Sequence, residues 1–323
     1  MHYDIFNGDA DGICALHQLR LHTPRPEAVL TTGVKRDIAL LSTLQDIEHA
    51  SLTVLDISLE SNRAYLLKIL NQSNQVLYID HHFAGEIPQT PALTAHINPS
   101  PDTCTSLIVN SQLQGQWLPW AIVGAFGDNL HDAAHTIASP LALGTEVMGQ
   151  LQELGELLNY NGYGSSLADL HFHPADLYKA LSPYENPLDF IASSPELAVL
   201  RQGYQVDMDL ALSQQVINPG NINRIYSFPD APWARRVSGV FANLKAQEKK
   251  DAAHALIAPN PDATLRISVR APLQNRKNAD TLCLAFPTGG GRTAAAGINA
   301  LPPAMLDEFI AAFQTTFAPS HKH

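Results

Sequence analysis

Four short apolar segments of the chain each lead into one or more carboxylates. They are residues 3–6, 52–55, 76–79 and 120–126, followed respectively by Asp9 and Asp11, Asp56, Asp80 and Asp128. Segments of this length, rich in β-branched and aromatic residues, are typical of buried strands. Because ligands of open α/β sheets bind at the carboxyl ends of the strands, we expect these carboxylates to lie along one edge of a sheet.

Segments of helical character separate the expected strands. We expect strands at residues 2–7, 28–32, 52–56 and 76–80, with helices near residues 13–21, 38–44 and 61–70. This alternation predicts βαβ units and a doubly wound, mostly parallel sheet. The proline-rich stretch Pro88–Pro101 predicts a surface loop, and Thr103 is expected to cap the next helix.

The last third of the chain has a different pattern. A long helical segment, Pro195–Leu212, is followed by the turn-forming residues Asn218–Asn221. Further strands are expected at residues 224–228, 254–258, 265–269 and 282–284, with helices near 238–245 and 303–313. We therefore predict an α/β protein of two domains. These are a doubly wound, mostly parallel sheet over residues 1–190, a helical linker over 191–214, and a smaller α/β domain with a mixed sheet over 215–323.

The composition favours a soluble, folded protein. Apolar residues make up 45% of the 323 positions and charged residues 16%, which is typical of globular domains. No run of about 18 apolar residues could span a bilayer, and no charged leader precedes an apolar segment at the N-terminus. Cys14, Cys104 and Cys283 are odd in number and widely spaced, which argues against a disulfide framework. We expect a cytoplasmic protein with no membrane partner.

The net charge of −11 is distributed unevenly. Residues 1–214 hold 8 Lys and Arg against 24 Asp and Glu, whereas residues 215–323 hold 12 against 7. An acidic domain that binds metal ions and a basic domain that binds phosphates would give this asymmetry, but so would solvated acidic helices. Because the overall charge repels polyanions and no basic run could follow a backbone, we expect a small nucleotide substrate and no long nucleic acid.

Carboxylates and imidazoles occur together in this pattern. One segment reads Asn7-Gly8-Asp9-Ala10-Asp11-Gly12 and another reads Asp80-His81-His82. Several carboxylates at one edge would repel one another strongly unless cations neutralised them. Oxygen ligands with one or two imidazoles suit Mn²⁺ or Mg²⁺ better than a closed zinc site. An EF-hand loop is excluded, because Gln18 stands where a bidentate Glu is required and a strand precedes the segment.

Five motifs, taken in order, resemble those of the DHH family of phosphoesterases. They are the Asp-rich segment 7–12, the isolated Asp56, the signature Asp80-His81-His82, Gly127-Asp128, and Gly289-Gly290-Gly291-Arg292 followed by Ala295-Ala296-Gly297. The resemblance extends from residue 7 to residue 297 and implies a DHH domain joined to a DHH-associated C-terminal domain. The branch that this chain resembles contains oligoribonucleases, or nanoRNases, and bifunctional phosphoadenosine-phosphate phosphatases.

The resemblance also implies metal ligands and a mechanism. Two Mn²⁺ ions, with Mg²⁺ as the alternative, would be held by Asn7, Asp9, Asp11, Asp56, His81 and Asp128. A hydroxide between the two ions would attack phosphorus in line and expel the ribose 3′ oxygen. Asp80 would orient a histidine, and His82 would contact or protonate the phosphoryl group. Asn7 stands where the family commonly has His or Asp, so its carbonyl oxygen would be a weaker ligand.

In the second domain the resemblance implies contacts with the substrate. Arg270 lies in a segment, Arg266–Arg270, that resembles the family's Ser-x-Arg strand, and it would form a bidentate contact with phosphate. Gly289–Gly291 would offer backbone amides to phosphate, helped by the N-terminus of a following helix. Arg292 replaces the family's usual His, and its planar fork suits phosphate or a guanine edge. We expect a linear, 5′-phosphorylated dinucleotide to be cut into mononucleotides, and we hypothesise a preference for guanine that links the enzyme to cyclic dinucleotide turnover.

The residues leave other functions open. The substrate could be 3′-phosphoadenosine 5′-phosphate, a cyclic dinucleotide or a longer single strand. Pyrophosphate hydrolysis uses a similar Asp-His-His site but would not need the glycine-rich domain, and a catalytically weak nucleotide sensor is a third class. His131 and His135, on one helical face, are either an extra metal or phosphate contact or an exposed surface. The pattern does not encode the oligomeric state, and a homodimer is compatible with it.

Overall fold

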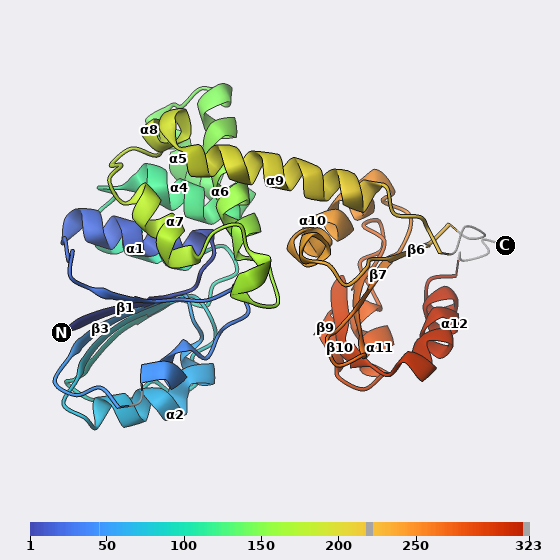
Figure 1. Ribbon diagram of the computed structural model, residues 1–323, viewed down its shortest axis with the longest axis horizontal. Helices are drawn as coiled ribbons and strands as arrows, with labels where there is room; N and C mark the ends of the chain where they lie inside the picture. The colour runs from blue at the N-terminus through green and yellow to red at the C-terminus, as the bar shows by residue number, and fades with distance from the viewer. Residues whose placement is uncertain (45, 218–221, 319–323) are drawn as a thin grey trace. The chain divides into compact units, whose positions relative to one another are not determined.

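The computed structural model describes residues 1–44, 46–217 and 222–318. The chain forms two compact units, Met1–Tyr204 and Gln205–His323. The division falls inside helix α9, Pro195–Leu212, which is the helix expected at this place (Figure 1). The turn expected at Asn218–Asn221 lies outside the described residues, and the expected domain limits stay a prediction.

A five-stranded parallel sheet forms the centre of the first unit. Its strand order is β2-β1-β3-β4-β5, with β1 His2–Phe6, β2 Val29–Thr31, β3 Ser51–Leu55, β4 Gln75–Asp80 and β5 Leu93–Ile97. One face is covered by α2, Leu59–Leu70, and the 3-10 helix η1, Leu40–Leu44, and the other face by α1, Ala10–His22 (Figure 1). The expected doubly wound parallel sheet is therefore confirmed.

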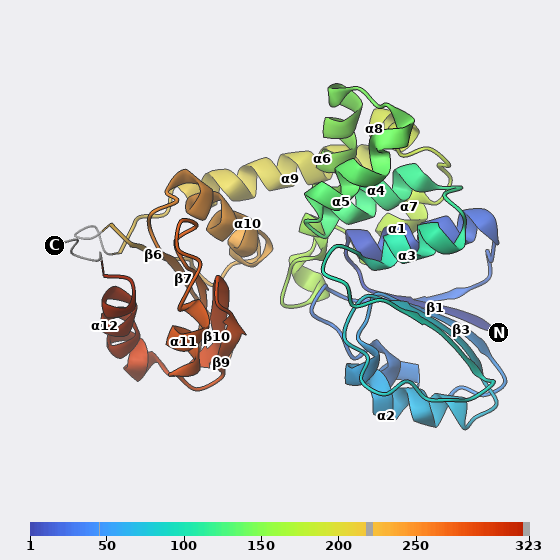
Figure 2. The same cartoon turned by 180° about the vertical axis from the view of Figure 1, so that it is seen from behind.

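Helices form a further layer over α1. They are α3 Thr105–Gln112, α4 Leu118–Gly127, α5 His131–Ala138, α6 Thr145–Gly162, α7 Pro174–Leu181 and α8 Pro187–Ser193, with 3-10 turns η2 Ser139–Leu141 and η3 Leu167–Asp169. Helix α4 contacts α1, α3, α5 and α6, so it is enclosed by other helices (Figure 2). These neighbouring helices therefore hold the C-terminal end of α4 in a fixed position.

Three expectations about this unit are wrong. The segment Trp120–Phe126 is not a strand but part of α4, and all its residues are buried. An enclosed helix is apolar on all sides, so its sequence has the same continuous apolar run as a buried strand. The stretch Pro88–Pro101 contains strand β5 as well as loop. The next helix begins after Cys104 without a side-chain cap, so Thr103 does not cap it.

The second unit contains a mixed sheet of order β6-β7-β8-β10-β9, as expected. Its described strands are β6 Arg224–Ser227, β7 His254–Pro259, β8 Leu265–Arg270, β9 Gly289–Arg292 and β10 Ala295–Leu301, of which only β6 and β7 pair in parallel. Helix α10, Pro232–Glu248, contacts β7 and β8. The opposite face forms a core with α11, Ala279–Leu284, and α12, Leu306–Thr316, which follows the 3-10 turn η4, Pro303–Met305.

Two expectations about the second unit are also wrong. Residues 282–284 are not a strand but the end of α11. Gly289–Gly291 does not precede a helix, because it belongs to β9, which pairs with β10 in an antiparallel hairpin. A methyl group on Gly289 would collide with the carbonyl oxygen of Cys283, and Gly291 has a φ of +138°. These glycines therefore allow close packing of the hairpin, and no helix dipole acts at this place.

The three cysteines are all buried and free, as the absence of a disulfide framework requires. Cys14 lies in α1, Cys104 precedes α3 and Cys283 lies in α11. Among the described residues, no helix combines the length and the apolar character needed to cross a bilayer.

A glycine in α6 determines how closely α4 approaches it. An alanine methyl at position 155 would overlap the backbone of Val123 and Gly127, whereas one at Gly149 in the same helix would meet nothing within 4 Å. We predict that Gly155→Ala costs about 1–3 kcal/mol of stability through overpacking. The control Gly149→Ala should be neutral or stabilising by up to about 1 kcal/mol, because alanine is the better helix former. Thermal unfolding measures both, and equal midpoints would contradict this packing.

Candidate metal centre

The expected ligands come together at the carboxyl edge of the parallel sheet. Asp56 directly follows β3, and Asp80 is the last residue of β4. Asp9 caps α1 by accepting a hydrogen bond from the backbone N–H of Gly12 at 3.1 Å. Asp128 is the C-terminal cap of α4, so it comes from a helix and not from a strand. The structure thus gathers these carboxylates, although one of the four segments has a different secondary structure from the one expected.

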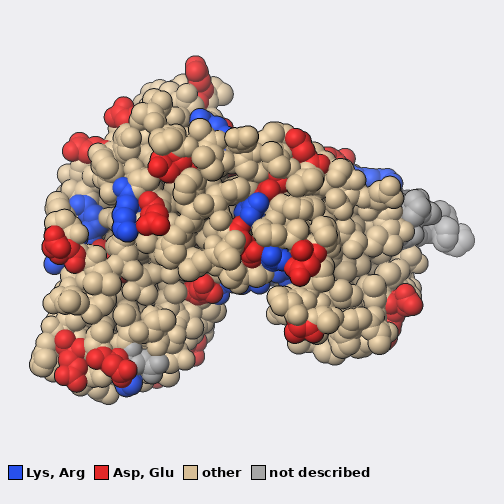
Figure 3. Space-filling model, viewed as in Figure 1, with Lys and Arg blue, Asp and Glu red and all other residues tan. Residues whose placement is uncertain are grey.

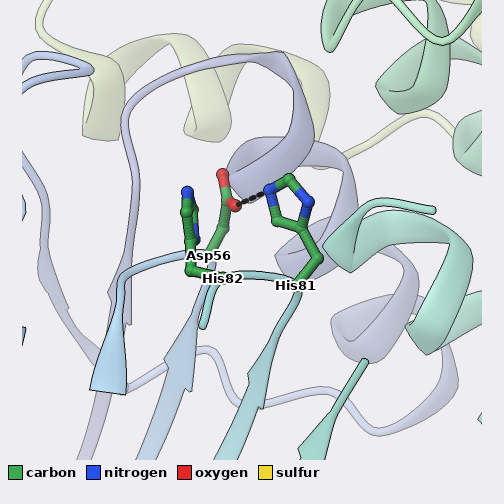
Figure 4. A group of neighbouring side chains, drawn as sticks. All are labelled: Asp56, His81 and His82. Atoms are coloured by element: carbon green, nitrogen blue, oxygen red, sulfur yellow. Dashed lines mark ion pairs between the residues drawn. The ribbon is translucent and has the colours of Figure 1, made fainter. Parts of the chain in front are cut away.

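His81 lies at the middle of this cluster. Its Nε2 atom is 3.3 Å from Asp56 Oδ1 and 3.8 Å from Asp128 Oδ2. Two groups of ligand atoms lie within 4.8 Å of one another, Asp56 with His81 and His82, and Asp11 with His81 and Asp128. Figure 4 shows Asp56 between the two imidazoles, above the ends of the strands. Such a set of carboxylate oxygens and imidazole nitrogens is suited to a divalent cation.

Asp11 is held by the N-terminus of α3. The backbone N–H groups of Thr105 and Ser106 each donate to one of its carboxylate oxygens at 2.7 Å. These amides are free for the contact because the first turn of a helix has no internal acceptors for them. The Thr105 hydroxyl also donates to Asp56 Oδ1 at 3.2 Å. Helix α3 therefore fixes two of the expected metal ligands, which the sequence interpretation did not foresee.

Asp56 and Asp128 are the two carboxyl groups of the cluster whose pKa values are raised. Burial, with the neighbouring carboxylates of Asp11 and Asp9, raises the pKa of Asp56 well above its usual range. Burial and Asp11 likewise raise the pKa of Asp128 to about 6. Asp56 also has a φ of +59°, which is uncommon for residues other than glycine, asparagine and aspartate. Both shifts mean that the protein itself supplies too little positive charge to stabilise the ionised form of these two carboxyl groups.

Asp80 and His82 form a pair beside the cluster. His82 Nδ1 lies 2.7 Å from Asp80 Oδ1, and this hydrogen bond raises the pKa of His82. The other oxygen of Asp80 is buried and has no hydrogen-bond partner among the described residues. The carboxylate fixes the orientation of the imidazole and leaves Nε2 available for another contact. This is the orienting arrangement that the resemblance implied for Asp80.

Lys35 is part of this site, and the sequence interpretation missed it. Its ammonium nitrogen lies 2.6 Å from Asp9 Oδ2, 3.1 Å from Asn159 Oδ1 and 3.4 Å from Asp128 Oδ1. Burial by itself would raise the pKa of Asp9, but Lys35, together with the hydrogen bonds from Gly12 and Asp56, lowers that pKa below its ordinary value. In the sequence Lys35 has no neighbour that reveals a contact with Asp9, so only the folded chain could have shown it.

Asn7 lies next to Lys35, at the start of the loop between β1 and α1. Its Nδ2 donates to the backbone carbonyl of Lys35 at 3.2 Å. Its Oδ1 is buried and has no hydrogen-bond partner among the described residues. A buried, unpaired acceptor is costly, so this oxygen is suited to a cation or a water molecule. Its role as a ligand stays a prediction.

His131 and His135 lie in α5, and their rings pack against the ring of Phe126 at centroid distances of 5.7 and 5.5 Å. Neither belongs to a potential metal group among the described residues. The structure therefore shows contacts with Phe126 for both rings, and a phosphate contact stays a prediction.

In the second unit, the strand register aligns Arg270 of β8, Ala295 of β10 and Arg292 of β9, which we call the arginine row. Directly opposed residues of antiparallel strands place their side chains on the same face, and two strand spacings separate the arginine backbones by roughly 10 Å. Arg270 Nε donates to Asn243 Oδ1 of α10 at 2.9 Å. Arg292 is exposed, and a methyl group on Gly290 would meet nothing within 4 Å. Small residues, Ala295 and Gly290, thus line the surface between the two arginines.

The residues of the first unit fit a divalent cation. The donor set is oxygen-rich with one or two imidazoles, the Asn7 oxygen is unpaired, and the carboxylates repel one another. Asp11, Asp56, His81 and Asp128 would hold the ion. Mn²⁺ and Mg²⁺ both suit this donor set.

Comparison with known proteins establishes the fold. No protein-family model matches the sequence, and no curated protein matches it. The structure is similar to that of exonuclease RecJ bound to manganese, with a TM-score of 0.64 and 16% identity over 98% of this chain and 90% of that chain. RecJ from Thermus thermophilus in complex with Mn²⁺ gives 0.59 and 15%, over 98% of this chain and 52% of that chain.

A third solved structure is that of PggH, a pGpG-specific phosphodiesterase from Vibrio cholerae. It has a TM-score of 0.57 and 15% identity, over 98% of this chain and 99% of that chain. The two RecJ structures and that of PggH share the two-domain architecture of DHH-family phosphoesterases. The chain described here therefore has the fold of the DHH-family phosphoesterases.

Because the ionised form of the buried Asp56 is unfavourable, a neutral residue at this position should change the stability of the metal-free protein. Asp56→Asn keeps a residue that tolerates the positive φ, and it removes one repelling charge. We predict that the metal-free variant unfolds at a higher temperature than the metal-free wild type. Mn²⁺ at about 100 times its Kd should stabilise the wild type by about 2.7 kcal/mol, or roughly 5–10 °C, but should stabilise the variant much less.

The matched control for this experiment is Asp46→Asn, because Asp46 is an exposed carboxylate paired with Lys68 at the surface. It should leave both the metal-free midpoint and the Mn²⁺ effect unchanged. An Asp56→Asn protein that is less stable than the wild type without metal and equally stabilised by Mn²⁺ would contradict the assignment.

Proposed function

We propose that this protein is a metal-dependent phosphoesterase that hydrolyses short linear nucleotides. The observation that carries the proposal is the convergence of Asp11, Asp56, His81 and Asp128 at the carboxyl edge of the sheet, with the Asp80–His82 pair beside them. The proposal is supported by the fold, which this chain shares with the exonuclease RecJ and the phosphodiesterase PggH. A cation bound here would act as a Lewis acid on a phosphoryl oxygen and make bound water more acidic.

The chain's own residues supply the remaining chemistry. Hydrolysis adds water to phosphorus and breaks the bond between phosphorus and the ribose 3′ oxygen, which must gain a proton as it leaves. His82 is suited to hold that proton, because its hydrogen bond to Asp80 raises its pKa and fixes its ring. Its Nε2 would donate to the phosphoryl group or to the leaving oxygen. Thr105 and Ser106 keep Asp11 and Asp56 in place during the reaction.

The substrate that we propose is a linear dinucleotide with a 5′-phosphate, such as pGpG. The arginine row is suited to a phosphate or a guanine base of such a nucleotide, since guanidinium groups bind phosphate oxygens and guanine edges in a bidentate manner. PggH, whose fold this chain shares, is described as pGpG-specific. The exposed Arg292 is the residue on which we base the preference for guanine.

A long single strand is a less suitable substrate. The net charge is −11, which repels a polyanion. On the face drawn in Figure 3, Lys and Arg side chains are scattered between Asp and Glu side chains and do not form a continuous track. Proteins that bind single strands without sequence preference use such a basic track.

The test is a Mn²⁺-dependent assay on pGpG, pApA, 3′-phosphoadenosine 5′-phosphate, cyclic di-GMP and a longer 5′-phosphorylated strand. We predict turnover of the linear dinucleotides to mononucleotides, with pGpG the best substrate, and little turnover of the others. Arg292→His should reduce the preference for pGpG over pApA, because imidazole lacks the bidentate fork. Lys250→Ala, which removes an exposed cation of the same unit, is the control and should leave the preference unchanged.

A second variant separates catalysis from binding. His82→Gln should lower kcat by roughly 10²- to 10⁴-fold and change the affinity for pGpG much less, because the glutamine amide can still donate a hydrogen bond to the phosphoryl group but cannot transfer a proton. Tight binding of nucleotides by the wild type without any turnover would refute the enzyme and favour a nucleotide sensor.

A further inference from the structure

The buried carboxylates of the metal centre differ in how their charge is balanced. Asp11 accepts two backbone N–H groups from α3, Asp80 is paired with His82, and Asp9 is paired with the ammonium group of Lys35. Asp56 and Asp128 both lie beside His81, whose Nε2 atom is 3.3 Å from Asp56 Oδ1 and 3.8 Å from Asp128 Oδ2. The need for an added cation is therefore concentrated at one end of the cluster.

The ammonium group of Lys35 is fully coordinated by oxygen atoms. A lysine ammonium has three N–H donors, and three side-chain oxygens surround this one, from Asp9 at 2.6 Å, Asn159 at 3.1 Å and Asp128 at 3.4 Å. The ring of Tyr163 lies 5.7 Å away as a further cation contact. With one oxygen atom for each of its N–H donors, Lys35 places a cation among the expected metal ligands.

The backbone holds Lys35 in this position. Its N–H donates to the carbonyl of Gly162 at the end of α6 at 2.8 Å, and its carbonyl accepts from Asn7 Nδ2. Two residues further on, Asp37 accepts from the backbone N–H of Val34 at 3.0 Å and closes the turn. The lysine is therefore attached to the β1–α1 loop and to α6, which carry Asn7 and Asn159. A lysine on a free surface loop would have none of these restraints.

The potential metal ligands other than Asp9 are grouped around His81. Both potential metal groups among the described residues contain His81, and neither contains Asp9. Asp9, which the resemblance counts among the ligands of the two ions, is the carboxylate already neutralised by Lys35. A second divalent cation beside Asp9 would have to displace the ammonium group or lie against it, at a large electrostatic cost.

We propose that Lys35 takes the place of one of two metal ions, so that each chain binds a single divalent cation at Asp11, Asp56, His81 and Asp128. This inference rests on the proposed metal dependence. In it, Lys35 supplies a fixed positive charge on the Asp9 side of the site, and the divalent ion supplies the charge on the His81 side. Removal of the lysine charge opens the Asp9 side to a second ion.

The test counts metal ions and does not depend on activity. The full chain is dialysed against Mn²⁺ in excess of its Kd, and bound manganese per chain is measured by elemental analysis, together with the electron paramagnetic resonance spectrum. We expect one Mn²⁺ per wild-type chain with the spectrum of an isolated ion. Lys35→Met, which keeps the length of the side chain without its charge, should bind two ions that are magnetically coupled, as ions roughly 3.5–4 Å apart are.

Two controls separate charge from shape. Lys35→Arg keeps the positive charge and should bind one ion, and Lys68→Met removes a lysine that is paired at the surface and should also bind one. Two coupled ions in the wild type would overturn the inference and leave the proposed function standing. One ion in both the wild type and a folded Lys35→Met protein would overturn it as well. No bound Mn²⁺ in the wild type would refute the metal dependence itself.

Discussion

Repulsion among buried carboxylates is the constraint on which this structure depends. Asp9, Asp11, Asp56 and Asp80 are all almost completely buried at one edge of a sheet, and Asp128 lies beside them. Buried charges persist only when opposite charges or hydrogen-bond donors surround them. The first unit provides three kinds of partner, which are the amides of α3, the ammonium of Lys35 and the imidazole of His82. What these partners leave uncompensated is the driving force for binding a cation.

Helix packing also contributes to the geometry of this centre. The close approach of α4 and α6 at Gly155 positions Asp128, and α6 also carries Asn159, which coordinates Lys35. Asp11 depends on the start of α3, which lies 94 residues further along the chain. The site is thus assembled from long-range contacts and not only from the ends of neighbouring strands. The arrangement follows from the fold, although each ligand belongs to a short local motif.

The sequence predicted strands β1 to β4 of the first sheet and β6 to β8 of the second, because these strands have clear apolar runs bounded by turn residues. It missed β5, in a proline-rich stretch, and β9 and β10, in a stretch rich in glycine and alanine, where turn signals hide the apolar pattern. It also indicated which carboxylates and histidines meet, since parallel strands end at one edge. It failed at Trp120–Phe126 and at residues 282–284, where an apolar run fits a buried helix as well as a strand. Lys35 and the amides of Thr105 and Ser106 could not be predicted, because their partners are distant in sequence and no local pattern marks such contacts.

The most direct test of the cation site at His81 is the position of bound metal in crystals grown with Mn²⁺, measured by anomalous diffraction at the manganese edge. We expect one strong peak next to His81, Asp56 and Asp128, with the Lys35 ammonium still in contact with Asp9. A peak next to Asp9 with the lysine side chain displaced, or no peak at this edge of the sheet, would contradict it.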